Sequence, residues 1–137
     1  MRVNPYLHFN GNCKEAFELY AKVFHSKIGH MMTYAGSPMA AHAPPDWGDK
    51  IGHVAMKIGE TIVYGSDAMP QYYQKPAGLF VSVSIESIEE SERIFAELSE
   101  GANVTMPLQE TFWAHRFGML TDRFGTPWMI NSEKPMN

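Results

Sequence analysis

The chain has 137 residues, with 11 Lys plus Arg against 15 Asp plus Glu, six His and one Cys. A chain of this length is expected to form one domain over 1–137, and 45% hydrophobic residues are enough for its core. The net charge of −4 excludes the clustered basic surface typical of nucleic-acid binding. A single cysteine cannot form an intrachain disulfide, so the composition favours a cytoplasmic protein.

The start of the chain does not resemble a targeting segment. Pro5, His8 and Asn10 interrupt it before an apolar run of signal-peptide length forms. Every apolar run in the chain is much shorter than the roughly 18 residues that a membrane helix needs. We therefore expect no signal peptide and no membrane span.

The first half of the chain predicts strand, helix, strand and hairpin. Asn12 followed by Glu15 is typical of a capping box at a helix start, and apolar residues then recur at helical spacing. Gly59-Glu60 is typical of a two-residue hairpin turn. The proline-rich segment 35–50 is expected to form a mobile lid. The predicted elements are a strand over 3–10, a helix over 12–24, a strand over about 27–34 and a hairpin over 51–58 and 61–66.

The second half predicts the same order of elements. Ser87 and Glu90 form a second capping box, and Gly101 marks the end of that helix. The predicted elements are a strand over 78–86, a helix over 87–99, a short strand over about 102–106 and a hairpin over 116–121 and 127–131. We therefore expect two modules, about 1–68 and 78–131, joined by a linker over about 69–77.

Several polar residues occur where strands would otherwise be apolar. His8 and His53 either face a cleft or are structural groups with satisfied hydrogen bonds, and only several such groups in one cavity would indicate a binding site. Asp67 and Asp122 end predicted strands, where a carboxylate commonly caps a turn. Cys13 lies in the first turn of a predicted helix, a position that lowers a thiol pKa, but we favour its role as a small apolar filler.

The segment 109–118 has the highest density of chemically useful side chains. Glu110, Trp113, His115 and Arg116 bring together a carboxylate, an indole, an imidazole and a guanidinium, which suits the orientation of a small polar ligand against an aromatic wall. Glu110 is also a candidate general base or metal ligand. In the alternative interpretation, the aromatic residues of this segment fill the core and the charged residues are solvated.

Other functional classes lack their motifs. The chain contains no P-loop, no Gly-x-Gly-x-x-Gly after a strand, no Gly-x-Ser-x-Gly and no His-Glu-x-x-His. An interaction protein that docks a partner through Trp47 and the proline-rich segment 36–50 is a further hypothesis.

Three segments, Asn4–Cys13, Gly65–Pro70 and Gln109–Asn131, together carry a resemblance to a known family. The most specific part is Gln-Glu-Thr-Phe-Trp-Ala-His-Arg-Phe-Gly followed by Thr-Asp-Arg-Phe-Gly-Thr-Pro-Trp-Met-Ile-Asn. The chain resembles the PhnB-like branch of the vicinal oxygen chelate superfamily, which includes glyoxalase I and bleomycin- and fosfomycin-resistance proteins. The resemblance implies an α+β fold of two βαβββ modules whose mixed sheets curl into a cup around a cleft, commonly within a homodimer.

The resemblance also implies where a metal would bind. Metal-dependent members hold a divalent ion on the first and last strands of the modules, and His8 matches a first-strand position. The corresponding strand of the second module offers Phe80, Ser82 and Ser84, none of which is a normal ligand. We therefore favour a metal-free protein with no cofactor. A displaced metal site, formed by His8 with His53, Glu110 and His115, is the alternative.

The expected function is that of a small-molecule-binding protein of the glyoxalase/bleomycin-resistance type, and the sequence does not decide whether it is an enzyme. The alternative is a divalent-metal-dependent lyase, isomerase, dioxygenase or thiol transferase that acts on a substrate with vicinal oxygens and uses Glu110 as base. Members of this branch are often described as ubiquinone methyltransferases, but no glycine-rich loop for S-adenosylmethionine follows the first predicted strand. Expected partners are a small-molecule ligand and a second copy of the chain. Six residues are expected to line the cleft: His8, His53, Glu110, Trp113, His115 and Trp128.

Overall fold

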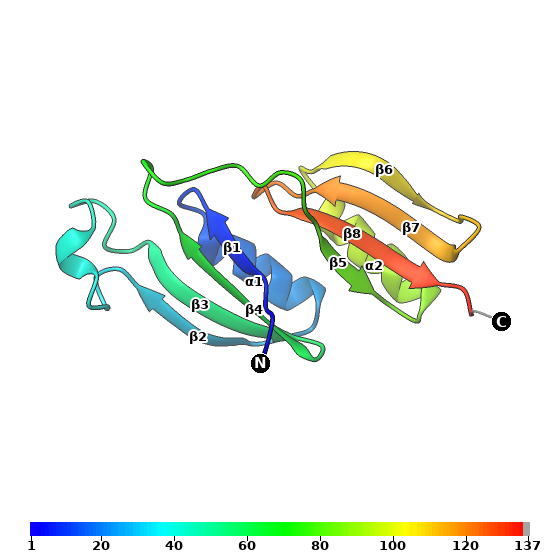
Figure 1. The fold of residues 1–137 in the computed structure, drawn as a ribbon, viewed down its shortest axis with the longest axis horizontal. Coiled ribbons are helices and arrows are strands. Elements are labelled where there is room, and N and C mark those ends of the chain that lie inside the picture. The colour runs from blue at the N-terminus through cyan, green and yellow to red at the C-terminus, as the bar shows by residue number, and fades with distance from the viewer. Residues whose placement is uncertain (136–137) are drawn as a thin grey trace. The chain divides into compact units, whose positions relative to one another are not determined.

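The computed structural model describes residues 1–135, and the chain divides between Gln74 and Lys75 into two compact units, module one and module two. Each module contains one four-stranded mixed sheet with one helix against one of its faces (Figure 1). The predicted α+β class with two βαβββ modules is confirmed. Among the described residues, no helix is both long and apolar enough to cross a bilayer.

Module one begins with a strand and a helix and ends in a hairpin. Its sheet has the order β1-β4-β3-β2, in which β1 and β4 are parallel and the other pairs are antiparallel. The elements are β1 (Tyr6–Phe9), α1 (Cys13–Val23), β2 (Ile28–Thr33), the short 3₁₀ helix η1 (Ala40–His42), β3 (Ile51–Ile58) and β4 (Thr61–Asp67).

Module two repeats this topology. Its sheet has the order β5-β8-β7-β6, again with one parallel pair, β5 and β8. The elements are β5 (Val81–Ser84), α2 (Ile88–Ser99), β6 (Asn103–Gln109), β7 (Ala114–Thr121) and β8 (Pro127–Glu133). The repeated order of elements that the sequence predicted is therefore present in the fold.

The predicted strands differ from the observed ones mainly in length. β6 was expected to end at residue 106, before Pro107, but it continues to Gln109. Proline is tolerated there because β6 is an edge strand, where one side of the backbone needs no ladder partner. β1 and β5 are shorter than predicted, because each pairs with its parallel neighbour over only four residues.

The start of α1 differs from the prediction in its chemistry. The side chain of Asn12 makes no capping hydrogen bond, so the predicted capping box is wrong. Instead the backbone N–H of Cys13 donates to Oδ1 of Asp67 over 3.0 Å. A carboxylate from the end of β4 thus accepts a hydrogen bond from the first turn of the helix. For α2 the serine half of the predicted capping box is confirmed, since Oγ of Ser87 accepts from the Glu90 N–H over 3.1 Å. The Glu90 carboxylate accepts from Arg93.

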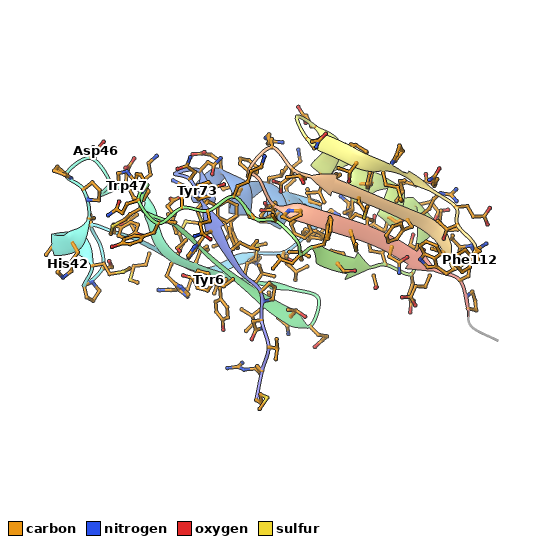
Figure 2. The ribbon with its side chains drawn as sticks, turned by 45° about the horizontal axis from the view of Figure 1, so that its top comes forward. Tyr6, His42, Asp46, Trp47, Tyr73 and Phe112 are labelled. Atoms are coloured by element: carbon orange, nitrogen blue, oxygen red, sulfur yellow. The ribbon has the colours of Figure 1, made fainter. Side chains whose placement is uncertain are left out.

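The segment 35–50 is anchored rather than detached. The Tyr34 N–H donates to the Lys50 carbonyl over 2.9 Å, and the Ala35 N–H donates to the Gly48 carbonyl over 3.0 Å. Trp47, labelled in Figure 2, is buried and packs edge-on against Tyr34 with 5.8 Å between ring centroids. The indole of Trp47 belongs to the core of module one and is not available to bind a partner. This burial argues against the hypothesis that Trp47 docks a partner protein.

Each helix covers one face of its own sheet. In module one the buried residues of α1, among them Phe17 and Tyr20, pack on inward-facing strand residues such as Phe9 and Val54. Side chains alternate between the two faces of a strand, so every second residue of β1 to β4 lies on the face that α1 does not cover. We call this uncovered face the open face of module one.

Candidate functional site

The open face of module one carries a cluster of tyrosine and histidine side chains. The strand register pairs Tyr6 with Tyr64, Tyr64 with Ala55, and Ala55 with His30, which places neighbouring strands' residues side by side on one face. We define the Tyr/His cluster by its five members from all four strands: Tyr6, His8, His30, His53 and Tyr64.

The rings of the Tyr/His cluster contact one another. Tyr6 stacks on Tyr64 with 6.1 Å between centroids and lies edge-on to His8 at 5.5 Å. His53 lies 5.5 Å from Tyr64 and 6.4 Å from His30. Oη of Tyr6 is 3.4 Å from Nδ1 of His53. Because Tyr6 is 48% exposed within the chain, the cluster presents its rings to the exterior of module one.

The sequence predicted two members of this cluster and missed three. His8 and His53 were selected as polar residues on apolar strands, and the structure places both on the open face. Tyr6 was overlooked, although alternation from His8 along the same strand would have found it. His30 and Tyr64 were missed because the pairing register is not visible in a single sequence.

Module two presents aromatic residues in the loop between β6 and β7. Phe112, labelled in Figure 2, is 89% exposed. It packs edge-on against Trp113 with 4.7 Å between ring centroids, and Trp113 packs against Phe117 at 5.3 Å. The Ala114 N–H donates to Oγ1 of Thr111 over 3.0 Å, which closes the loop. Phe112 and Trp113 therefore lie at the surface of module two, not in its core.

Glu110, the candidate base, lies at the surface of module two. Its carboxylate forms a 3.0 Å ion pair with Nζ of Lys134. The hydrogen bond and the positive charge of Lys134, assisted by Arg116 and His115, lower the pKa of Glu110. A lowered pKa makes the carboxylate a weaker base, which disfavours the role of Glu110 as general base.

Arg116 and His115 lie at the start of β7. Nε of Arg116 donates to Oε1 of Glu92 on α2 over 3.0 Å, so Arg116 lies on the helix side of the sheet. The half-buried His115 falls at a register irregularity between Ala114 and Arg116, where side chains do not follow simple strand alternation. The face of the sheet that His115 occupies therefore does not follow from its position in the strand.

Trp128 belongs to the core of module two. It is fully buried, and its indole Nε1 donates to Oδ2 of Asp122 over 2.8 Å. Asp122 also accepts from the backbone N–H groups of Phe124 and Thr126, which confirms its predicted turn-capping role. The prediction that Trp128 lines a ligand cleft conflicts with this burial, and we exclude the residue from the proposed site.

Cys13 is completely buried at the start of α1. Burial raises the pKa of its thiol, and the negative charges of Asp67 and Glu15 raise it further. These effects exceed any lowering by the helix N-terminus, so the thiol is protonated and unreactive at neutral pH. The interpretation of Cys13 as an apolar filler agrees with this environment.

The donor groups do not fit a conventional divalent metal site within either module. Across residues 1–135, no three His, Cys, Asp or Glu side chains gather closely enough to hold a metal ion. His8 and His53 both contact Tyr6, while Glu110 lies in the other module on Lys134. A resident divalent ion normally takes three or more such ligands.

The two βαβββ modules have the topology of the glyoxalase/bleomycin-resistance-like fold. The chain is similar to the PhnB protein from Bacillus cereus, a putative 3-demethylubiquinone-9 3-methyltransferase, with 21% identity, a TM-score of 0.81 and coverage of 96% and 98% of the two chains. It is also similar in fold to a fosfomycin resistance protein, FosX from Listeria monocytogenes, with 11% identity, a TM-score of 0.65 and coverage of 98% and 93%. That protein was crystallised with Mn(II) and 1S,2S-dihydroxypropylphosphonic acid.

The sequence comparisons identify the family. The family described as 3-demethylubiquinone-9 3-methyltransferase matches residues 1–131. Protein YjdN from Escherichia coli is 34% identical over 144 residues, which cover 98% of this chain and 97% of YjdN. The crystal structure of protein PA1353 from Pseudomonas aeruginosa has 43% identity, a TM-score of 0.89 and coverage of 98% and 99%. The chain therefore belongs to this family, the PhnB-like branch that its motifs indicated.

Proposed function

We propose that the chain is a small-molecule-binding protein and that the Tyr/His cluster is its main binding surface. The observation that supports this proposal is the gathering of five ring side chains on a sheet face that the module's own helix leaves uncovered. Contiguous exposed aromatic surface is unfavourable in water and commonly marks a binding site.

The cluster offers two kinds of contact to a ligand. Tyr6 and Tyr64 stack on each other, so their ring edges are the part of the pair that contacts the body of a ligand. The imidazoles of His8, His30 and His53 and the phenol hydroxyls donate or accept hydrogen bonds at its polar groups. In module two, Trp113, which is 43% exposed, and the half-buried His115 are proposed as ligand contacts of that module.

A methyltransferase activity is not part of this proposal, although the family's description names one. The loop between β1 and α1 contains one glycine, Gly11, and no glycine-rich motif follows any strand. The proposal assigns binding without requiring a cofactor. A homodimer is its expected assembly.

A fragment screen of the full chain followed by NMR tests the proposal. We expect binders that shift the aromatic signals of the Tyr/His cluster, and we expect Tyr64→Ala to weaken them about tenfold, because half of the stacked tyrosine pair is removed. Tyr72→Ala is the matched control, since Tyr72 is 69% exposed outside the cluster. Equal losses in both variants, or no binder at the cluster, would contradict the proposal.

The second candidate function is the metal-dependent lyase, isomerase, dioxygenase or thiol transferase. The fold neighbour FosX, which holds Mn(II), favours it, and the absence of a three-ligand group among residues 1–135 disfavours it. Protein purified without chelator distinguishes the two functions. Near-stoichiometric Mn, Fe, Ni or Zn that is lost in His8→Ala would support the metal-dependent function over binding alone.

A further inference from the structure

We infer that the ligand of the Tyr/His cluster is an organic anion with a flat ring body. This inference rests on the proposed function and adds the chemical class of the ligand. It is carried by the charges of the open face and by the geometry of the tyrosine pair.

The open face of module one carries no carboxylate from its strands. The chain has 15 Asp plus Glu, but β1 to β4 contain only one of them, Asp67. Asp67 is 1% exposed and lies on the α1 side, where it accepts from the Cys13 N–H. The charged side chain that strand alternation places on the open face is Lys57, paired with Ile62.

The same face is rich in hydrogen-bond donors. The two phenol hydroxyls each donate one proton, and each imidazole donates at least one N–H whatever its tautomer. An anionic oxygen accepts several such bonds, and bonds to an ionised group are stronger than those between neutral groups. A cationic ligand would meet Lys57 and no carboxylate from the strands of this face.

The tyrosine pair favours a flat body for the ligand. The rings of Tyr6 and Tyr64 lie within 26° of parallel, and the His53 ring is tilted by 32° from Tyr64. A stacked pair presents its ring edges side by side, and aromatic edges pack on the face of another planar group. The competing possibility is an aromatic cage, in which ring faces bind a cation.

Three probes that share a phenyl ring test the inference on the full chain at neutral pH. Benzenesulfonate is an anion, benzenesulfonamide is neutral and phenyltrimethylammonium is a cation. We expect benzenesulfonate to bind the cluster about fivefold more tightly than either of the others, as measured by NMR titration.

Each other outcome overturns the inference in a recognisable way. Equal affinity for the sulfonate and the sulfonamide shows stacking without charge preference, and the proposed function then still stands. Tightest binding of the ammonium probe indicates an aromatic cage. If none of the three probes shifts the cluster, the inference fails, and the fragment screen separately decides the proposed function.

Two pairs of variants locate the preference. His53→Phe keeps a ring beside Tyr64 but removes both ring nitrogens, so we expect the preference for the sulfonate to fall to about twofold or less. His42→Phe on η1, outside the cluster, is its control. Lys57→Gln is a second test, in which the preference for the sulfonate is measured after loss of the positive charge on the open face. Lys22→Gln is its control, because Lys22 is also exposed but lies on α1. Wild-type preference for the sulfonate in both His53→Phe and Lys57→Gln would contradict the inference.

Discussion

At the residue scale, Asp67 connects three parts of module one. Its Oδ1 accepts from the Cys13 N–H at the start of α1, and its Oδ2 accepts from the Ile51 N–H at the start of β3 over 2.8 Å. Its backbone carbonyl accepts from the hydroxyl of Tyr34 over 2.6 Å. The carboxylate of this buried residue thus joins the helix to the hairpin, and its backbone carbonyl adds the base of the segment 35–50.

This arrangement predicts that Asp67→Asn destabilises the protein by about 2 kcal/mol. The amide has one acceptor oxygen instead of two, so either the Cys13 N–H or the Ile51 N–H faces an NH₂ group and remains unpaired in the core. Urea unfolding followed by circular dichroism measures the change. Asp49→Asn, at an exposed position, is the control, and equal midpoints for the two variants would show that the carboxylate does not have this role.

The sequence was informative about residues whose partners are close along the chain. Asp122 was correctly predicted to cap a turn, because its partners Phe124 and Thr126 follow within four residues. Asp67 was also assigned to a turn, but its partners lie 54 and 16 residues away, and that separation hid its role at the helix start. Trp128 was predicted to line a cleft. Its burial in the core depends on tertiary packing, which the sequence alone does not reveal.

At the element scale, each helix meets its sheet through an aromatic ring over a glycine. Phe17 of α1 lies above Gly65 on β4, and Phe95 of α2 lies above Gly118 on β7. Each glycine is paired across the strands with a β-branched residue, Val54 and Ile130 respectively. The glycine is on the fourth strand of module one, β4, but on the third strand of module two, β7, and the β-branched residue is on the other strand of each pair. The duplicated order of elements did not predict this difference.

We expect Gly118→Ala to destabilise module two by about 1 to 3 kcal/mol and more than Gly65→Ala destabilises module one. A methyl group at Gly118 would lie 2.7 Å from Cε2 of Phe95 and 3.0 Å from the backbone Cα of Leu108, which cannot rotate away. At Gly65 the closest atoms, at 2.6 Å, belong to the ring of Phe17, which can shift.

Thermal unfolding of both variants tests this ranking. Phe17→Leu combined with Gly65→Ala should recover part of the lost stability, because the shorter side chain leaves room for the methyl group. The ranking is wrong if Gly65→Ala is the more destabilising of the two substitutions.

At the scale of the whole molecule, the sequence predicted the duplicated architecture but not the composition of the surface that the fold exposes. Periodicity and turn chemistry were sufficient for the order of elements in both modules, because these signals are local. The Tyr/His cluster draws on four strands between residues 6 and 64, so its assembly depends on sheet register. The sequence named its histidines at positions 8 and 53 without the tyrosine pair that accompanies them.

An exposed aromatic residue outside the Tyr/His cluster leads to the prediction that the protein is a homodimer in solution. Each module is of a size at the margin of independent stability. In module two, Phe112 is 89% exposed within a single chain. Burial of such a side chain against a second copy contributes about 1.5–3 kcal/mol, so we expect a mass about twice 15.5 kDa by light scattering.

The loop that carries Phe112 provides the variant that tests this assembly. Phe112→Ser should weaken the dimer about tenfold or more, because it removes a large exposed apolar side chain that a second copy would bury. Leu79→Ser is the control, since Leu79 is 62% exposed at the beginning of module two and also loses an apolar side chain. A wild-type mass near 15.5 kDa at every concentration would refute the dimer. A dimer weakened equally by both substitutions would show that the aromatic loop is not a specific dimer contact.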